Sequence, residues 1–230
     1  MITVKKKFRH KENPLKKNYR RVDAVTHDSG YRFYKLPDGS WAPSVTTVTG
    51  LKKSQFFKEW REKNPYEAQR TLNRGNIFHY LVENYLQNKN PEEYWTDEPG
   101  HDLLAVAEQF ICDIDNIMCQ ENTLWSEKFG LAGRVDCVGD FQGKLSIIDF
   151  KASTRPKDEK DITNYFVQGA AYAMMFEERT GIPINQIVII IACEDGTSQV
   201  FIQKPKEYMK QLLEDLEYFW KEFDKENNSG

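Results

Sequence analysis

Residues 187–191 form an unbroken run of β-branched aliphatic side chains, Ile-Val-Ile-Ile-Ile. A strand that is apolar on both faces is typical of a central strand with helices packed against each side. The run therefore predicts an α/β fold in which a mixed central sheet is flanked by helices.

Hydrophobic periodicity and turn signals predict the other elements. We expect a hairpin around Asp28-Ser-Gly30 and a helical cover built from residues 42–90. The expected helices span 54–63, 66–88, 101–120 and 162–179, with a last helix from 206. The expected strands span 123–129, 132–140, 144–151, 186–193 and 198–203.

Length and composition limit the organisation of the chain. The 230 residues fit a single domain at 23–226 after a basic, flexible tail at 1–22. The net charge is −3, yet the first 21 residues hold nine Lys or Arg and one Glu. This tail is either a phosphate-binding segment or a solubilising one.

Targeting and cysteine patterns exclude several classes of protein. No apolar run approaches about 18 residues, so no membrane span is expected. The N-terminus resembles neither a signal peptide nor a mitochondrial transit peptide, which favours the cytoplasm of a bacterial or phage-infected cell. The four cysteines form no CxxC pair, which argues against zinc or iron–sulfur ligation.

Two neighbouring strands carry the residues with the clearest chemistry. Gly133-Arg134-Val135-Asp136 precedes Asp149-Phe150-Lys151, and the turn signal at 141–144 lets the strands pair. Asp149 and Lys151 then share one face while Phe150 packs on the other. Two carboxylates suit Mg²⁺ or Mn²⁺, and a lysine beside them can contact a phosphate or the attacking water. The set indicates metal-assisted phosphodiester hydrolysis.

Four motifs in this order carry a family resemblance. They are Gly75-Asn-Ile-Phe-His79, the strand with Asp136, the strand Ile148-Asp149-Phe150-Lys151, and Gln168-Gly-Ala-Ala-Tyr172. Together they resemble the PD-(D/E)XK (restriction-endonuclease-like) superfamily, and within it the RecB-like nucleases. Arg74-Gly75, Pro43-Ser44-Val45-Thr46 and Glu194-Asp195-Gly196 are more narrowly similar to the mitochondrial genome maintenance exonuclease group and its phage and bacterial relatives. Ala152 departs from the threonine that often follows the lysine in these relatives.

The resemblance implies roles for the site residues. Asp136 and Asp149 would hold the metal, with His79 as an additional ligand and Glu127 a carboxylate close to it. Lys151 would position water or stabilise charge, and Gln168 would orient Lys151 or a phosphate. Tyr172 would join the catalytic set or serve mainly in the core. His79 would otherwise be a structural residue, and Glu127 would pair with a lysine across the strands.

A second group of residues is expected to contact DNA. Hydroxyls at a helix start and after the strand, together with exposed arginines, suit phosphates. The candidates are Ser44, Thr46, Thr47, Arg70, Arg74, Arg134, Ser153 and Thr154. Ordinary helix capping explains Ser44 equally well. The aromatic residues Trp41, Phe56, Phe57 and Trp60 would stack on bases, although core packing is the expected use of most of them.

The resulting interpretation is a Mg²⁺- or Mn²⁺-dependent DNA exonuclease that prefers single-stranded DNA with a free end. It would act as a monomer, away from membranes, in replication, recombination or repair, with possible protein partners there. The alternatives are a duplex exonuclease or endonuclease, a non-catalytic module that binds DNA ends, and a nuclease subunit that requires a partner.

Overall fold

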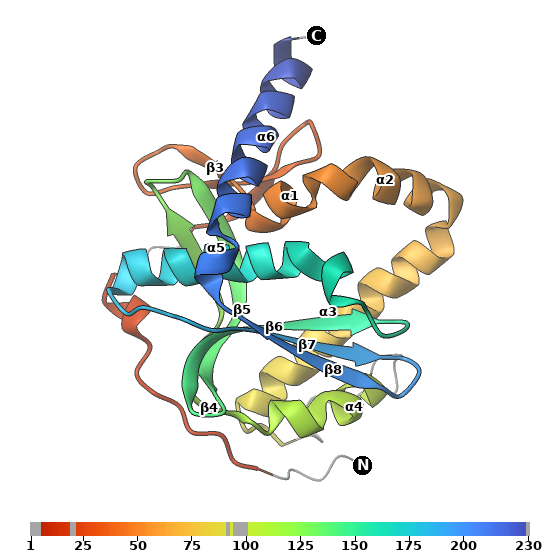
Figure 1. Cartoon of the computed structure of the whole chain (residues 1–230), viewed down its shortest axis with the longest axis vertical. Helices are drawn as coiled ribbons and strands as arrows, with labels where there is room; N and C mark the ends of the chain where they lie inside the picture. Colours follow the sequence, from red (N-terminus) through yellow and green to blue (C-terminus); the bar gives the residue numbers. More distant parts are fainter. Residues whose placement is uncertain (1–5, 19–21, 91–92, 94–100, 229–230) are drawn as a thin grey trace.

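A five-stranded sheet forms the centre of the protein. The computed structural model describes residues 6–18, 22–90, 93 and 101–228. The strand order is β4 (Ile114–Ser126), β5 (Leu131–Phe141), β6 (Lys144–Ser153), β7 (Ile187–Cys193) and β8 (Ser198–Gln203). Only β6 and β7 pair in parallel, and the chain crosses between them through η4 (Glu159–Ile162) and α5 (Thr163–Thr180). The predicted mixed sheet with flanking helices is confirmed (Figure 1).

The apolar run on β7 is covered on both sides, as its sequence predicts. Ile187, Ile189 and Ile191 pack toward α5, which follows the parallel crossover. Val188 and Ile190 instead face the cluster built by α3 (Pro65–Leu86) and α4 (His101–Ile111). The C-terminal helix α6 (Met209–Asn228), reached through η5 (Pro205–Glu207), packs outside α5. Within the described part of the chain, no helix is long and apolar enough to cross a membrane.

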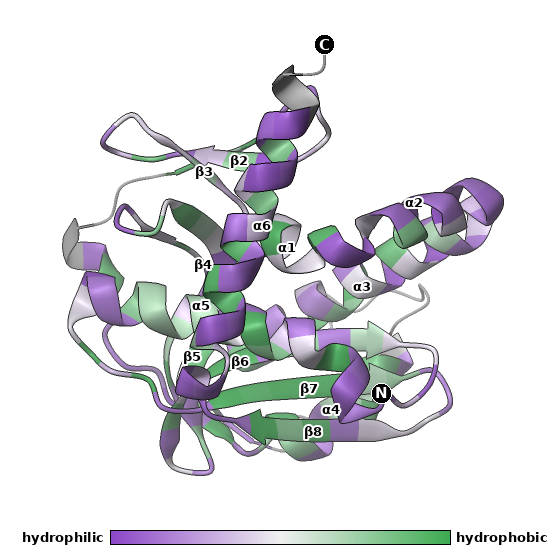
Figure 2. Ribbon diagram, turned by 45° about the horizontal axis from the view of Figure 1, so that its top comes forward, coloured by the Kyte–Doolittle hydropathy of each residue, from purple (hydrophilic) through white to green (hydrophobic). Residues whose placement is uncertain are grey.

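The segment before α3 builds a projecting arm. After η1 (Pro14–Asn18), a small antiparallel sheet of β1 (Ala24–Thr26), β2 (Arg32–Lys35) and β3 (Trp41–Pro43) leads into α1 (Val45–Gly50), η2 (Leu51–Lys53) and α2 (Ser54–Lys63). No residue of α2 is buried. The arm formed by α2 and the first half of α3 stands out from the body and is mostly hydrophilic (Figure 2).

The second part of one expected helix is wrong. The helix predicted at 101–120 ends at Ile111, and β4 begins at Ile114. The pairing of β4 with β5 shifts register between Asp115 and Cys119, and Asn116 has a φ of 47°. This irregularity brings Ile114 and Ile117 to the same apolar cluster at a spacing of three. A bulged strand thereby imitates helical periodicity.

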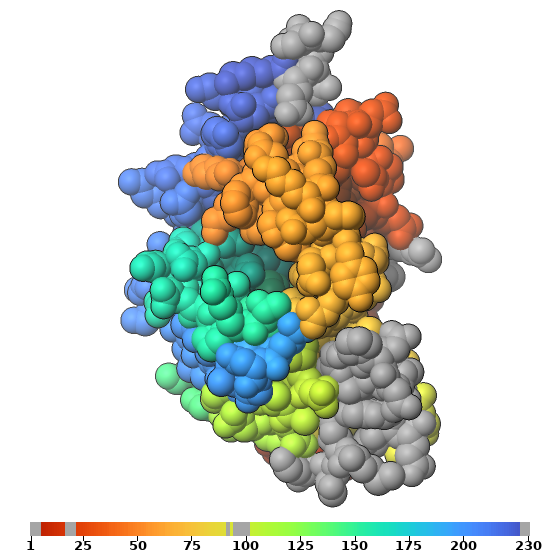
Figure 3. Space-filling model, turned by 90° about the vertical axis from the view of Figure 1, so that its right-hand side faces the viewer, coloured from red at the N-terminus to blue at the C-terminus, as the bar shows by residue number. Residues whose placement is uncertain are grey.

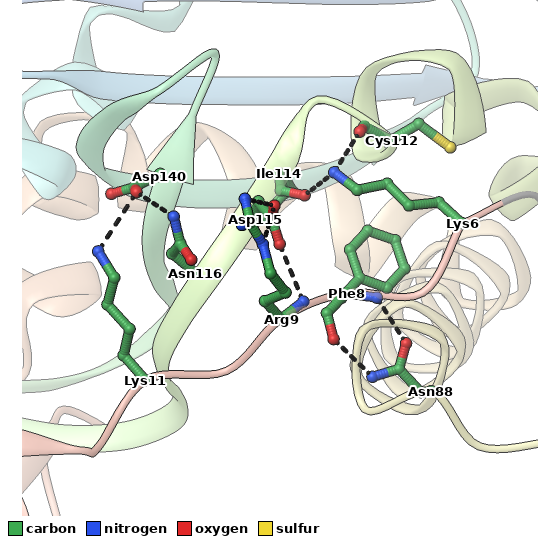
Figure 4. Close-up of polar contacts among 10 residues, drawn as sticks. All are labelled: Lys6, Phe8, Arg9, Lys11, Asn88, Cys112, Ile114, Asp115, Asn116 and Asp140. Carbon is green, nitrogen blue, oxygen red and sulfur yellow. Dashed lines mark hydrogen bonds and ion pairs between the residues drawn. The ribbon is translucent and has the colours of Figure 1, made fainter.

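The N-terminal tail is also partly different from its prediction. Residues 6–11, here called the strap, run along the outer edge of β4 (Figure 4). Phe8 is buried beside Tyr85, and the Asn88 side chain bonds both the N–H and the carbonyl of Phe8. Arg9 pairs with Asp115 and holds the pKa of that carboxyl well below its usual range. The predicted flexible tail is wrong for the strap; residues 1–5 and 19–21 lie outside the described residues.

Two helical glycines provide a matched test of the packing. A Cβ at Gly169 of α5 would lie 2.4 Å from Ile187 Cγ2, whereas a Cβ at Gly75 of α3 would meet nothing within 4 Å. We expect Gly169→Ala to lower the free energy of unfolding by about 1–3 kcal/mol through overpacking. Gly75→Ala should raise it by about 0.4–1 kcal/mol.

Urea denaturation of both variants measures these changes. An Ile187→Ala background removes the opposing methyl group and should reduce the cost of Gly169→Ala. Equal effects of the two alanines would contradict the close contact of α5 with β7.

Candidate active site

The two central carboxylates meet where β5 and β6 separate. The ladder between these strands ends at the Cys137–Ile148 pair, one step before Asp136 and Asp149 would face each other. Beyond that point the Asp136 side chain replaces the backbone of β5 as hydrogen-bond acceptor, because its Oδ2 accepts a hydrogen bond from Phe150 N at 2.9 Å. Phe150 itself points into the apolar cluster under α3 and α4. The sequence-based placement of Asp136, Asp149 and Phe150 is reproduced.

Asp149 is held in a fixed position inside the protein. It is 1% exposed, and Gln168 Nε2 of α5 donates to its Oδ1 at 3.0 Å. Lys151 Nζ lies 2.5 Å from Asp149 Oδ2. Burial raises the pKa of Asp149 to about 6 despite the opposing charge of Lys151, and Asp136 adds to the rise. Gln168 therefore orients the carboxylate, whereas the sequence suggested Lys151 or a phosphate as its target.

Lys151 remains a cation in this environment. Burial works against its charge, but the neighbouring carboxylates of Asp149 and Asp136 outweigh burial and raise the pKa of Lys151. Its ammonium also lies 5.1 Å from the centre of the Tyr165 ring. Such a lysine offers a fixed positive charge, not a base.

A histidine and a third carboxylate complete the cluster. His79 Nδ1, on α3, lies 3.5 Å from Asp136 Oδ2 and 4.0 Å from Glu121 Oε1. Glu121 falls between the Gln120–Cys137 and Asn122–Val135 pairs, which places it opposite Asp136 across β4 and β5. Burial and Asp136 raise the pKa of Glu121 to about 7, although Arg134 Nε lies 2.8 Å from its Oε2.

Glu121 replaces Glu127 as the third carboxylate. Glu127 follows the end of β4, in the exposed turn before β5, so its predicted place near the metal centre is wrong. The sequence carried a usable signal for Glu121. If residues 114–126 are read as a strand paired with β5, Glu121 and Asp136 face each other.

The chemistry of this donor set fits a divalent cation. One ligand atom from each of His79, Glu121 and Asp136 can be chosen within 4.8 Å of one another, and Asp149 lies beside them. The charge of Asp136 raises the pKa of both Glu121 and Asp149, so a bound cation would relieve this repulsion. Oxygen ligands with one imidazole suit Mn²⁺ or Mg²⁺.

The cluster opens into a cleft of about 670 Å³. Its walls come from the small sheet, α1, α3, β4, β5 and α5. Tyr172 lines it and is almost fully buried, so the packing role considered for this residue holds. A Cβ at Gly133 would lie 3.0 Å from Tyr172 Cε1, which explains a glycine at the start of this motif.

The predicted DNA contacts separate into two groups. Thr46 and Arg134 line the cleft, and so does Ser44, which also caps α1 by accepting from Thr47 N at 3.0 Å. Ser153 is turned to its own loop, where its hydroxyl donates to Arg155 O, and Thr154 is exposed. Among the aromatic candidates, Trp41, Phe56 and Phe57 are exposed, so core packing is wrong for these three.

Arg70 and Arg74 are held by a carboxylate outside the cleft. Arg70 Nη2 lies 2.7 Å and Arg74 Nη1 2.9 Å from the two oxygens of Glu194, in the turn after β7. We call this group the clasp. It joins α3 to the end of the central sheet and accounts for two sequence motifs that are far apart along the chain.

The fold and the site together indicate a nuclease. Carboxylates, a lysine and a glutamine gather in this α/β protein at the point where two strands of the sheet separate. The sequence profile of the PD-(D/E)XK nuclease superfamily matches residues 51–228. The chain belongs to this superfamily.

Curated relatives agree with this assignment. The mouse and human proteins named mitochondrial genome maintenance exonuclease 1 are each 27% identical in alignments of 176 and 175 residues that cover 67% of this chain. The Xenopus tropicalis protein of that name is 25% identical over 171 residues. The chain matches 49–51% of the length of these relatives. A solved protein of Eubacterium rectale, provisionally described as an exonuclease, is 18% identical over 64% of each chain, with a TM-score of 0.45.

The titration of Glu121 predicts a pH-dependent stability in protein treated with EDTA. Its pKa in the folded state is about 7, above the ordinary value of 4.5, so folding favours the protonated form. Its contribution is complete below pH 4.5 and is lost as pH rises through 7. Glu121→Gln should therefore gain stability relative to wild type, by about 1–3 kcal/mol between pH 5 and 8.

Urea denaturation at pH 5 and pH 8 measures this difference. Glu127→Gln, in the exposed turn, is the matched control and should follow the wild-type pH dependence. A Glu121→Gln curve parallel to wild type would contradict the buried, mutually repelling carboxylates.

Proposed function

We propose that this chain is a divalent-metal-dependent deoxyribonuclease that degrades single-stranded DNA from a free end. The observation that carries the proposal is the cluster of His79, Glu121 and Asp136 in one cleft with Lys151, whose ammonium pairs with the buried Asp149. The matched relatives are named exonucleases, which supports exonucleolytic action. The setting we propose is DNA replication, recombination or repair.

Mg²⁺ or Mn²⁺ would be held by Asp136, Asp149, Glu121 and His79. When bound, the ion supplies Lewis-acid activation of the phosphate and of a water molecule. Uncatalysed hydrolysis of a phosphodiester is very slow, and enzymes accelerate slow reactions by up to roughly 10¹⁷-fold. The side chains of this site alone do not supply such an acceleration.

The protein side chains contribute orientation and charge. Gln168 fixes one oxygen of Asp149, and the Phe150 amide fixes one oxygen of Asp136. Lys151 stays protonated and offsets the negative charge that develops on the phosphate in the transition state. Each group is positioned before substrate arrives, which lowers the reorganisation needed for reaction.

The preference for unpaired DNA rests on the cover of the cleft. The cleft is lined by Ser44 and Thr46 at the start of α1 and by Asn76, His79 and Tyr80 of α3. The chain between these helices forms the projecting arm, and the clasp ties α3 to the sheet. A flexible strand inserted end-first fits beneath such a cover more readily than a duplex does. All of these residues come from one chain, so we propose a monomer.

The test compares end-labelled linear single-stranded DNA, duplex DNA and circular single-stranded DNA, with Mg²⁺ or EDTA. We expect Mg²⁺-dependent loss of the linear single strand only. Asp149→Asn should lower the rate by at least about 10²–10³-fold, because the ion loses a charged ligand in a preorganised site. Glu127→Gln is the control and should retain activity.

Other outcomes would replace the proposal. Cutting of the circle would show an endonuclease, and preferred loss of the duplex would show a duplex exonuclease. DNA binding without cleavage would indicate a module that binds DNA ends or a nuclease subunit that requires a partner.

A further inference from the structure

A second cavity lies beside Tyr165, outside the catalytic cleft. Its volume is about 580 Å³, and it appears as a hollow between α2 and the segment after β6 (Figure 3). Tyr165 lines this cavity, and its ring is the one approached by the Lys151 ammonium at 5.1 Å. Lys151 therefore lines the catalytic cleft and lies against a residue that lines the second cavity.

Cationic side chains outnumber carboxylates in the wall of this second cavity. Lys53, Arg155 and Lys157 line it, against the carboxylates of Asp158 and Asp161. The Asp158 carboxylate lies 3.8 Å from Lys160 Nζ, which offsets part of its charge. The Lys53 ammonium donates a hydrogen bond to Asp161 O at 3.0 Å. Lys53 therefore connects the start of α2 to the segment before α5. Arg155 and Lys157 are the cations left to meet a ligand.

The loop that carries these two cations has a fixed backbone. Ser153 Oγ donates to Arg155 O at 2.7 Å. The Gln199 side chain accepts from Lys157 N at 2.7 Å and donates to Lys157 O at 3.1 Å. Two flexible cationic side chains thus extend from a rigid support, which suits the recognition of phosphates.

An exposed aromatic ring completes the wall. Phe57 lines the cavity and is 45% exposed, on a helix that buries none of its residues. Phosphate-binding cations beside an exposed phenyl ring match the chemistry of a nucleotide, since unpaired bases stack on aromatic side chains. A volume of this size is ordinary for a small-molecule site.

We infer that this cavity binds the nucleotide of a single-stranded polynucleotide that adjoins the scissile phosphate, with Arg155 and Lys157 on its phosphates and Phe57 on its base. The inference rests on the proposed function and deepens it. A strand bound in both cavities passes Lys151, which brings one phosphate to the catalytic carboxylates. The cavity then fixes how far the strand advances.

Binding of a fluorescent single-stranded oligonucleotide in EDTA, at several salt concentrations, tests the inference. Arg155→Ala and Lys157→Ala should each lower the slope of log K against log salt by about 0.7, the value for one phosphate contact on a single strand. Phe57→Ala should weaken binding by about fivefold or more with an unchanged slope, because stacking involves no counterion release.

The controls are exposed residues that do not line the cavity. Tyr218→Ala removes an aromatic ring of α6 that is 38% exposed, and Lys210→Ala removes a lysine of α6 whose side chain is 90% exposed. Both should match wild type. If wild type binds and cleaves single-stranded DNA while the three cavity variants match these controls, the inference is overturned and the proposed function stands. If wild type neither binds nor cleaves it, both are overturned.

Discussion

Burial of the Asp149 carboxylate is the constraint on which the rest of the site depends. A charged group that is 1% exposed requires partners, and here Lys151 and Gln168 provide them from β6 and α5. The same burial raises the pKa of Asp149 to about 6. The parallel β6–β7 pair and the α5 crossover thus bring Asp149 of β6 and Gln168 of α5 into hydrogen-bonding contact. The other members of the cluster lie around this pair.

Regular periodicity made much of this arrangement predictable. The alternation of strand side chains gave Asp149 and Lys151 one face and Phe150 the other, and the apolar run on β7 predicted helices on both sides of the sheet. Residues within two to four positions of each other are fixed by local geometry. Spacing alone therefore put Asp149 and Lys151 on one strand face and Gln168 and Tyr172 on one helix face, whereas their place at the site rested on the family resemblance.

Irregular backbone and distant pairs were not predictable in the same way. The expected strand began at residue 123, so Glu121 lay outside it and the resemblance was applied to Glu127, although Glu121 lies opposite Asp136. The clasp joins Arg70 to a carboxylate 124 residues later in the sequence, and no local pattern encodes that contact. Two arginines interpreted as phosphate ligands instead bind one glutamate, because a nearby fixed carboxylate meets the same guanidinium geometry.

The strap contacts both elements that carry the outer ligands of the cluster. Phe8 is bonded to Asn88, just beyond the end of the His79 helix, while Arg9 and Lys11 are bonded to the strand that carries Glu121. It therefore ties together two elements that carry members of the carboxylate–histidine cluster, although it contains none of those residues. Proteolytic trimming of these few residues would remove contacts that join the end of the His79 helix to the Glu121 strand, at a distance from both side chains.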